Sequence, residues 1–193
     1  MLSDVKYDIE AQIIKLHEQT KSYVREIRKL VEVPHHLNQI SITSYFTYSV
    51  NISHVVGQES LCLGSYHIHN TGYLPITNPS ICIKFPKESP FSFSGRYVYE
   101  NLKQSLKKPG EWERINEKAN SEEIWLKPLG KNLIEPNEKI SYSNFQIKWT
   151  PTKSYGGSIM GFTYSDQTTD GISVLNPINL NGTIWTPQED DDE

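Results

Sequence analysis

Residues 40–53 read ISITSYFTYSVNIS, and this stretch decides the fold class. Its apolar and aromatic side chains alternate with Ser, Thr and Asn, and it is rich in the β-branched and aromatic residues that strands favour. Because successive side chains of a strand point to opposite faces, this alternation directs one face toward a core and the other toward solvent. We therefore predict that a β-rich region begins here.

The same pattern recurs as far as the C-terminal region. Further strands are predicted at SLCLGSYHIHN (60–70), SICIKF (80–85), EIWLKPL (123–129), KISYSNFQIKW (139–149), SIMGFTYS (158–165), GISVL (171–175) and NGTIW (181–185). Turn-forming Pro, Gly, Asn and Asp separate these segments, and the crossover helices that parallel strands need are missing from the pattern. The prediction is a mainly β protein with a single antiparallel, immunoglobulin-like or Greek-key β-sandwich over 40–186. A barrel is the alternative.

The N-terminal region has a helical period. Apolar residues spaced alternately four and three apart form a heptad seam with one polar interruption at Thr20. The seam consists of Ile9, Ile13, Leu16, Thr20, Tyr23, Ile27 and Leu30. Pro34 disfavours helical backbone at Val33. We predict a long amphipathic helix over 1–33 and a hinge over 34–39.

Two partners can cover this seam. The helix can fold back on its own β-domain, or it can pair with copies of itself as a coiled coil. Val24 and Val31 occupy e positions and broaden the apolar stripe, as expected for a bundle or for packing on the β-domain. We favour self-association because a strict 3.5-residue repeat is less common in a docked helix.

Composition excludes several classes of protein. The chain has 193 residues, 22% charged residues and a formal net charge of -4, as in ordinary globular proteins, so no nucleic-acid partner is expected. Apolar runs fall short of the roughly 20 residues that a membrane-spanning helix requires. The first residues lack the apolar core of a secretory signal, which predicts a cytoplasmic protein that can be part of a larger particle. Cys62 and Cys82 are then expected to be free thiols.

A charged segment over 100–123 interrupts the strand pattern. It contains Pro109 and Gly110, which predicts a long exposed insertion that either binds a partner or is a solvated loop. Trp112 favours the first interpretation, because a large aromatic side chain in so polar a context must pack on the sandwich or face a partner. Residues 187–193, PQEDDDE, predict a disordered acidic tail.

Two segments resemble a known family. YHIHNTGYLPITNPSICIKFP (66–86) resembles the strand, Asn-x-Gly turn and strand of bacterial immunoglobulin-like repeats, with Asn70 and Gly72 ending one strand and Ile81 and Ile83 in the next. LGKNLIEPNEKISYSNFQIKW (129–149) resembles the turn before a late strand of the same repeats. The resemblance implies the sandwich fold and no catalytic residues.

Candidates for catalysis and metal binding are few. Gly156–Gly161 does not match the nucleophile elbow of hydrolases, and phosphate-binding and dinucleotide-binding motifs are lacking, so we expect no enzyme and no cofactor. His67 and His69 share one face of a strand and are weak candidates for metal ligands. His54 or Asp166 would have to supply a third ligand.

These observations predict a non-enzymatic structural or protein-interaction subunit. Its helix forms a homo-oligomer, its β-sandwich is presented to another protein, and a stalk with such a head resembles in architecture the components of phage, prophage or spore assemblies. The alternative is a module that binds a carbohydrate or another small ligand. Trp112 and Tyr155, both expected in loops, are then the predicted contact residues.

Overall fold

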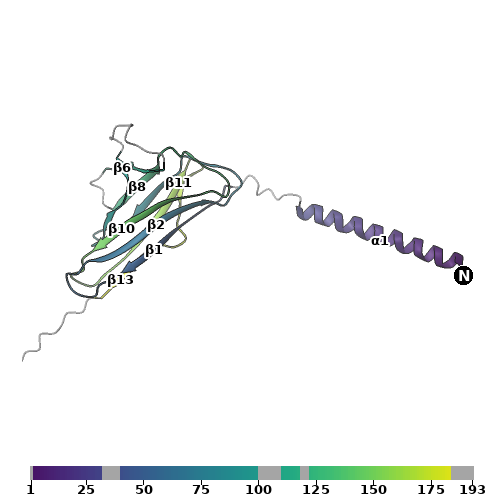
Figure 1. Ribbon diagram of the computed structural model, residues 1–193, viewed down its shortest axis with the longest axis horizontal. Helices are drawn as coiled ribbons and strands as arrows, with labels where there is room; N and C mark the ends of the chain where they lie inside the picture. Colours follow the sequence, from purple (N-terminus) through teal and green to yellow (C-terminus); the bar gives the residue numbers. More distant parts are fainter. Residues whose placement is uncertain (1, 32–39, 100–109, 118–121, 184–193) are drawn as a thin grey trace, which may run out of the picture. The chain divides into compact units, whose positions relative to one another are not determined.

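A computed structural model describes residues 2–31, 40–99, 110–117 and 122–183 of the chain (Figure 1). The chain divides into two compact units, 1–39 and 40–193. The predicted hinge, the predicted tail and Trp185 lie outside the described residues, as do 100–109 and 118–121 of the predicted insertion.

The first unit contains one helix, α1 (Leu2–Val31). The prediction of a long N-terminal helix is confirmed. Its last turn carries Arg28 and Lys29, whose positive charges lie near the negative end of the helix dipole. The helix ends at Val31, ahead of Pro34, as expected from the restriction that proline places on the residue before it.

The second unit is the predicted β-sandwich, and its two main sheets can be followed in Figure 1. The first sheet is antiparallel, and its order is β1 (Ile42–Asn51), β2 (Ser60–Asn70), β10 (Lys139–Trp149) and β5 (Ser92–Ser94). The predicted bounds of β2 and β10 are the observed ones. The short strand β5 was not predicted.

The second sheet covers the inner face of the first. Its order is β12 (Thr168–Ser173), β11 (Tyr155–Ser165), β4 (Ser80–Lys84), β8 (Glu123–Pro128), β7 (Trp112–Arg114) and β6 (Val98–Tyr99), and β13 (Ile178–Gly182) also pairs with β11. A separate ribbon joins β3 (Ile76–Thr77) to β9 (Leu133–Ile134). The one departure from the predicted antiparallel pairing in the described part is β6 with β7, which run parallel.

Alternate side chains of the two sheets form the core between them. Phe145 of β10 is completely buried and contacts the rings of Phe46 and Phe93 at centroid distances of 6.0 Å and 5.6 Å. A Cβ atom on Gly64 of β2 would lie 2.5 Å from the Phe145 ring, so glycine is required where this ring crosses the neighbouring strand. The size of Phe145 and the absence of a side chain at position 64 are therefore matched.

A buried polar link joins the two sheets. The Thr163 hydroxyl of β11 lies 2.6 Å from the Ser44 hydroxyl of β1 and 2.8 Å from the Tyr66 hydroxyl of β2. Burial raises the pKa of Tyr66 to about 12, so this phenol remains neutral and can donate a hydrogen bond. All three hydroxyls are paired, as buried polar groups must be.

The segment between β12 and β13 closes one edge of the first sheet. Both strands pair with β11, and residues 174–177 separate them. Here the Leu175 amide donates to the Ser44 carbonyl at 2.8 Å. The Asn176 side chain accepts from the Phe46 amide and donates to the Phe46 carbonyl, both at 2.9 Å. Asn176 thus takes the place of a neighbouring strand along part of β1.

The turns predicted from the two resemblance segments are confirmed. Asn70 ends β2, and its buried side chain donates to the carbonyls of Leu74 and Ile134 and accepts from the Gly72 amide. Asn137 has a φ of 63° in the turn before β10, a conformation that asparagine tolerates better than most residues.

The two cysteines are free and buried, as predicted. Burial raises the pKa of Cys62 to about 11 and that of Cys82 to about 12. Because the reactive species is the thiolate, we expect neither thiol to react with Ellman's reagent in the folded protein and both to react in denaturant. Rapid release of chromophore from the folded protein would contradict the buried positions.

Candidate functional site

The described side chains of the heptad seam are exposed within the first unit. Ile13, Leu16, Tyr23 and Ile27 are 60%, 65%, 63% and 58% exposed. The side chains of Ile9 and Leu30 lie outside the described residues. Apolar side chains at this spacing lie on one face of a helix. The described part of α1 therefore presents a continuous apolar stripe that nothing in its own unit covers.

Thr20 is the one polar residue in this apolar stripe. Its hydroxyl donates to the Leu16 carbonyl of the same helix at 2.8 Å. The polar atom is thus satisfied within the helix, and burial of Thr20 against another helix would leave no new unpaired hydroxyl. Thr20 can therefore be buried with its neighbours in the seam without the free-energy cost of an unpaired hydroxyl group.

Trp112 does not lie in an exposed loop, and that expectation is wrong. It begins β7, is 5% exposed, and donates from its indole N–H to the Ser141 carbonyl at 3.1 Å. Its ring packs edge-on against Tyr142 at a centroid distance of 5.5 Å. The prediction that 100–123 is an exposed insertion is therefore wrong for the strand at 112–114.

The two charged residues after Trp112 explain this error. Glu113 is 2% exposed and forms a 2.9 Å ion pair with Lys127 of β8. The Arg114 guanidinium lies 5.7 Å from the centre of the Tyr97 ring and donates to the Tyr97 hydroxyl at 3.3 Å. Charges paired in this way can be buried, although a charged run in a sequence usually indicates a solvated loop.

A cavity of about 580 Å³ opens beside Trp112. Six of the residues that line it are Tyr97, Trp112, Ser141, Tyr142, Ser143 and Asn144. The last two belong to an irregularity in β10, where its pairing with β2 shifts between Tyr142 and Phe145. Such a bulge redirects side chains from the regular face of a strand, here toward the cavity rim.

Tyr155 lies at a different cavity. It begins β11, is half-buried, and lines a space of about 330 Å³ between residues 86–90 and 150–156. Its ring contacts Trp149 and Phe91 at centroid distances of 5.8 Å and 6.2 Å. The two aromatic residues predicted as contacts thus do not form one platform, and Tyr155 is in a strand rather than a loop.

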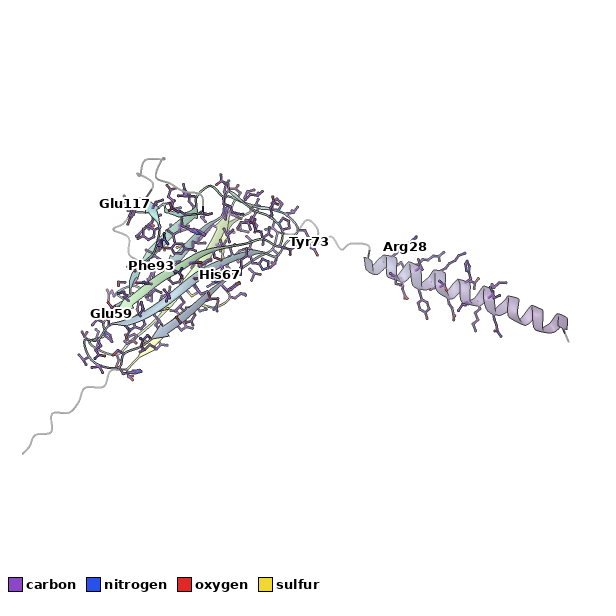
Figure 2. The ribbon with its side chains drawn as sticks, in the orientation of Figure 1. Arg28, Glu59, His67, Tyr73, Phe93 and Glu117 are labelled. Carbon is purple, nitrogen blue, oxygen red and sulfur yellow. The ribbon has the colours of Figure 1, made fainter. Side chains whose placement is uncertain are left out.

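The two candidate histidines lie on the outer face of the first sheet, where Figure 2 labels His67. The His67 ring nitrogens lie 2.8 Å from the Thr47 hydroxyl and 2.7 Å from the Ser141 hydroxyl. Burial, together with the charge of Lys139, lowers the pKa of His67. Both nitrogens are already engaged in hydrogen bonds, which would compete with coordination of a metal ion.

The nominal third ligands are not gathered around this pair. His54 lies 3.5 Å from the Thr183 carbonyl, whereas the Asp166 carboxylate accepts from Thr77 and Asn78 at 2.7 Å. Within the described ranges, no three His, Cys, Asp or Glu side chains are grouped so as to hold a metal ion. The same residues include no helix that is long and apolar enough to cross a membrane.

Among known proteins, this chain is similar only to solved structures. The sequence matches no protein-family model and no curated protein. A cohesin module from a Clostridium perfringens family 33 glycoside hydrolase is 14% identical, with 75% of this chain and 98% of that chain covered and a TM-score of 0.40. A family 3b carbohydrate-binding module of Clostridium clariflavum is 13% identical, with 70% and 98% covered and a TM-score of 0.32.

An exo-β-N-acetylglucosaminidase of Vibrio harveyi is also similar. The match is 13% identical, covers 75% of this chain and 18% of that chain, and has a TM-score of 0.28. Values as low as these assign no function to this chain.

Proposed function

We propose that the chain is a non-enzymatic interaction subunit that self-associates through α1 and thereby presents several copies of its β-sandwich to another protein. The observation that carries this proposal is the exposed seam, in which Ile13, Leu16, Tyr23 and Ile27 are each more than half exposed. Burial of one such side chain stabilises an assembly by about 1.5–3 kcal/mol. Burial of the whole seam would therefore contribute a large favourable term to the free energy of association.

A second copy of the same helix suits the charges of α1. Five basic residues between positions 15 and 29 would repel their counterparts if they flanked the contact. In the heptad register of the seam they occupy b, c and f positions, away from it: Lys15, Lys21, Arg25, Arg28 and Lys29. The flanking e and g positions of the same region hold mainly uncharged residues such as Gln12, Gln19 and Val24. Two copies can therefore approach without placing like charges at the interface.

The test is light scattering coupled to size-exclusion chromatography on the full chain. We expect a mass that is a multiple of 22.2 kDa and that falls toward the monomer on dilution. A monomer at every concentration up to the solubility limit would contradict self-association.

A second candidate function is binding of a carbohydrate or another small ligand by the β-sandwich. It is favoured by the cavity beside Trp112, whose volume of about 580 Å³ lies within the usual range for small-molecule sites of roughly 300–1,000 Å³. The two functions are compatible, since one uses α1 and the other uses strands of the second unit.

A further inference from the structure

Strand β1 lies at the edge of the first sheet, and part of that edge is free (Figure 1). The backbone groups of Ser44 and Phe46 that face away from β2 are paired with the segment 174–177. Because the backbone groups of successive residues point alternately to the two sides of a strand, Tyr48 and Val50 also direct their N–H and C=O groups away from β2. Among the described residues, these groups of Tyr48 and Val50 have no hydrogen-bond partner.

The side chains at this free edge are exposed, although they belong to the inner face of the sheet. Phe46 of the same face is 2% exposed, whereas Tyr48 and Val50 are 42% and 37% exposed. The described part of the second sheet thus covers the first half of β1 and leaves the second half open. An edge that combines unpaired backbone groups with exposed apolar side chains is one to which another strand can add.

This edge lacks the features that usually prevent such pairing. Natural edge strands are protected by charged side chains, by Pro or by bulges. Residues 40–58 and 171–183, which form this side of the sandwich, contain no Asp, Glu, Lys or Arg, although these make up 22% of the chain. Strand β1 has no Pro, and its pairing with β2 is regular along its whole length. Depletion of charged residues is also the mark of the buried centre of a protein interface.

The free edge is complementary to itself. If two copies are related by a twofold axis at Ser49 and their β1 strands run antiparallel, Tyr48 of each copy lies opposite Val50 of the other. Both free residues of each copy then belong to hydrogen-bonded pairs. An aromatic side chain lies opposite a β-branched one twice, which is a favourable cross-strand combination, and the two Ser49 residues lie opposite each other between them. A second copy of the same strand therefore satisfies the edge without placing charges together.

Both ends of the free edge limit this pairing to one register. A shift in one direction would require the N–H and C=O groups of Phe46, which the Asn176 side chain already occupies. A shift in the other direction would extend past Asn51, where β1 ends. A twofold contact uses the same surface on both copies and is closed, so it joins two copies and does not continue into a fibre.

A second apolar contact would accompany the pairing. Leu175 is 75% exposed, and its amide donates to the Ser44 carbonyl on the outer side of β1. In the twofold register, Ser44 of one copy lies toward His54 of the other. Val55 and Val56 follow directly and are 55% and 43% exposed. Exposed apolar side chains of the two copies are thus brought together at both ends of the paired strands.

We propose that the β1 edge of one copy pairs with the β1 edge of a second copy around Ser49, which joins their first sheets into one continuous sheet. The contact itself uses only residues of the second unit. Because it is short, the inference rests on the proposed function in one respect: association through α1 raises the local concentration of the sandwiches, and a weak contact then becomes populated.

The experiment is disulfide crosslinking of full-chain cysteine variants, with oxidised glutathione as the oxidant. The two Ser49 residues of the proposed pair are about 4.5 Å apart between Cα atoms, which a disulfide can span. The two Thr47 residues are roughly 13 Å apart along the strands, which is too far. Both side chains are exposed, and the native Cys62 and Cys82 are buried. We expect Ser49→Cys to form a covalent dimer at least about tenfold faster than Thr47→Cys.

A mixture of two variants tests the register. Thr47 of one copy lies opposite Asn51 of the other in the proposed pair. Thr47→Cys and Asn51→Cys should therefore crosslink slowly when each is alone and rapidly when they are mixed. The two variants differ in mass, so mass spectrometry identifies the mixed dimer. Faster crosslinking of either variant alone than of the mixture would show that the register is wrong.

A charge at the edge should prevent the pairing. Tyr48→Lys introduces the side chain that most often protects natural edge strands, so it should slow the crosslinking of Ser49→Cys about tenfold. Tyr73→Lys is the matched control, because Tyr73 is 62% exposed and lies outside the edge. It should leave the rate unchanged. Thermal unfolding of both variants checks that neither substitution disturbs the fold.

The same rates in two backgrounds separate this contact from association through α1. One background is the native α1 at micromolar protein concentration, and the other is Ile13→Glu at a concentration approaching the millimolar range. Preferential crosslinking of Ser49→Cys in either background supports the proposal, and equal rates of Ser49→Cys and Thr47→Cys in both overturn it. A preference in the Ile13→Glu background alone would support the edge contact and contradict association through α1. The molecular mass of the reduced samples reports on α1 separately.

Discussion

The Ile13→Glu variant of the full chain is expected to dissociate under conditions in which the Ile14→Glu variant remains associated. The two isoleucines are adjacent and are 60% and 61% exposed on α1, so their substitution should affect an isolated helix equally. Glutamate has a high helix propensity, so neither substitution should by itself destabilise the helix backbone. A difference between the two variants then reports on the contact between helices. Only Ile13 belongs to the seam, so only its replacement should weaken the assembly.

The expected effect is large because each copy contributes its own Ile13. Loss of about 1.5–3 kcal/mol from each of two buried side chains weakens a dimer by roughly 10²–10⁴-fold. Sedimentation equilibrium over a range of concentrations measures this change. Circular dichroism should show a parallel loss of helix in the dissociated variant, because most of the stability of a helix in a protein comes from packing of its apolar face.

Two results would contradict this account. Equal dissociation of both variants would mean that the buried face of α1 includes Ile14 and that the heptad register is wrong. Persistence of the oligomer in Ile13→Glu would move the self-association to the β-sandwich.

Replacement of Phe145 by alanine is expected to lower the free energy of unfolding by about 3–5 kcal/mol. Phe145 is completely buried, and its ring covers Gly64, which has no side chain to fill the resulting cavity. The rings of Phe46, Phe93 and Tyr142 would lose a common neighbour. A small domain has a total stability of about 5–15 kcal/mol, so this one change removes much of it.

Urea denaturation followed by tryptophan fluorescence measures the loss. Leu63→Ala is the control, because Leu63 lies on the neighbouring strand β2 and is 40% exposed. We expect this control to stay within about 0.5–1 kcal/mol of wild type. A similar loss in both variants would show that the core is not centred on Phe145.

The regular parts of the sandwich could be predicted from the sequence because their signal is local. Burial alternates along β2 and along the second half of β10, from Phe145 to Trp149, and the predicted bounds of both strands are the observed ones. The heptad spacing of α1 is equally local. The short strands β3, β5, β6 and β9 have two or three residues each, too few for a period to be recognised.

The wall of the cavity could not be predicted for a different reason. Glu113 and Arg114, which follow Trp112 in β7, are buried beside partners that lie far away in the sequence, such as Lys127 and Tyr97. The cavity also borders on a register shift between β10 and β2, which lies between Tyr142 and Phe145. Neither feature has a signature in neighbouring residues, although the Ser-Asn pair at 143–144 was a possible sign of a left-handed residue.

The Asn176 side chain is hydrogen-bonded to both the N–H and the C=O of Phe46, and this pairing would matter in an assembly of many copies. A helical stalk that joins several β-sandwiches by short segments raises the effective concentration of one sandwich near another toward the millimolar range. Exposed strand edges pair readily at such concentrations and lead to aggregation. Because Asn176 occupies the outward-facing N–H and C=O of Phe46, a strand from another copy cannot add there. The amide therefore protects this position of the β1 edge against such pairing.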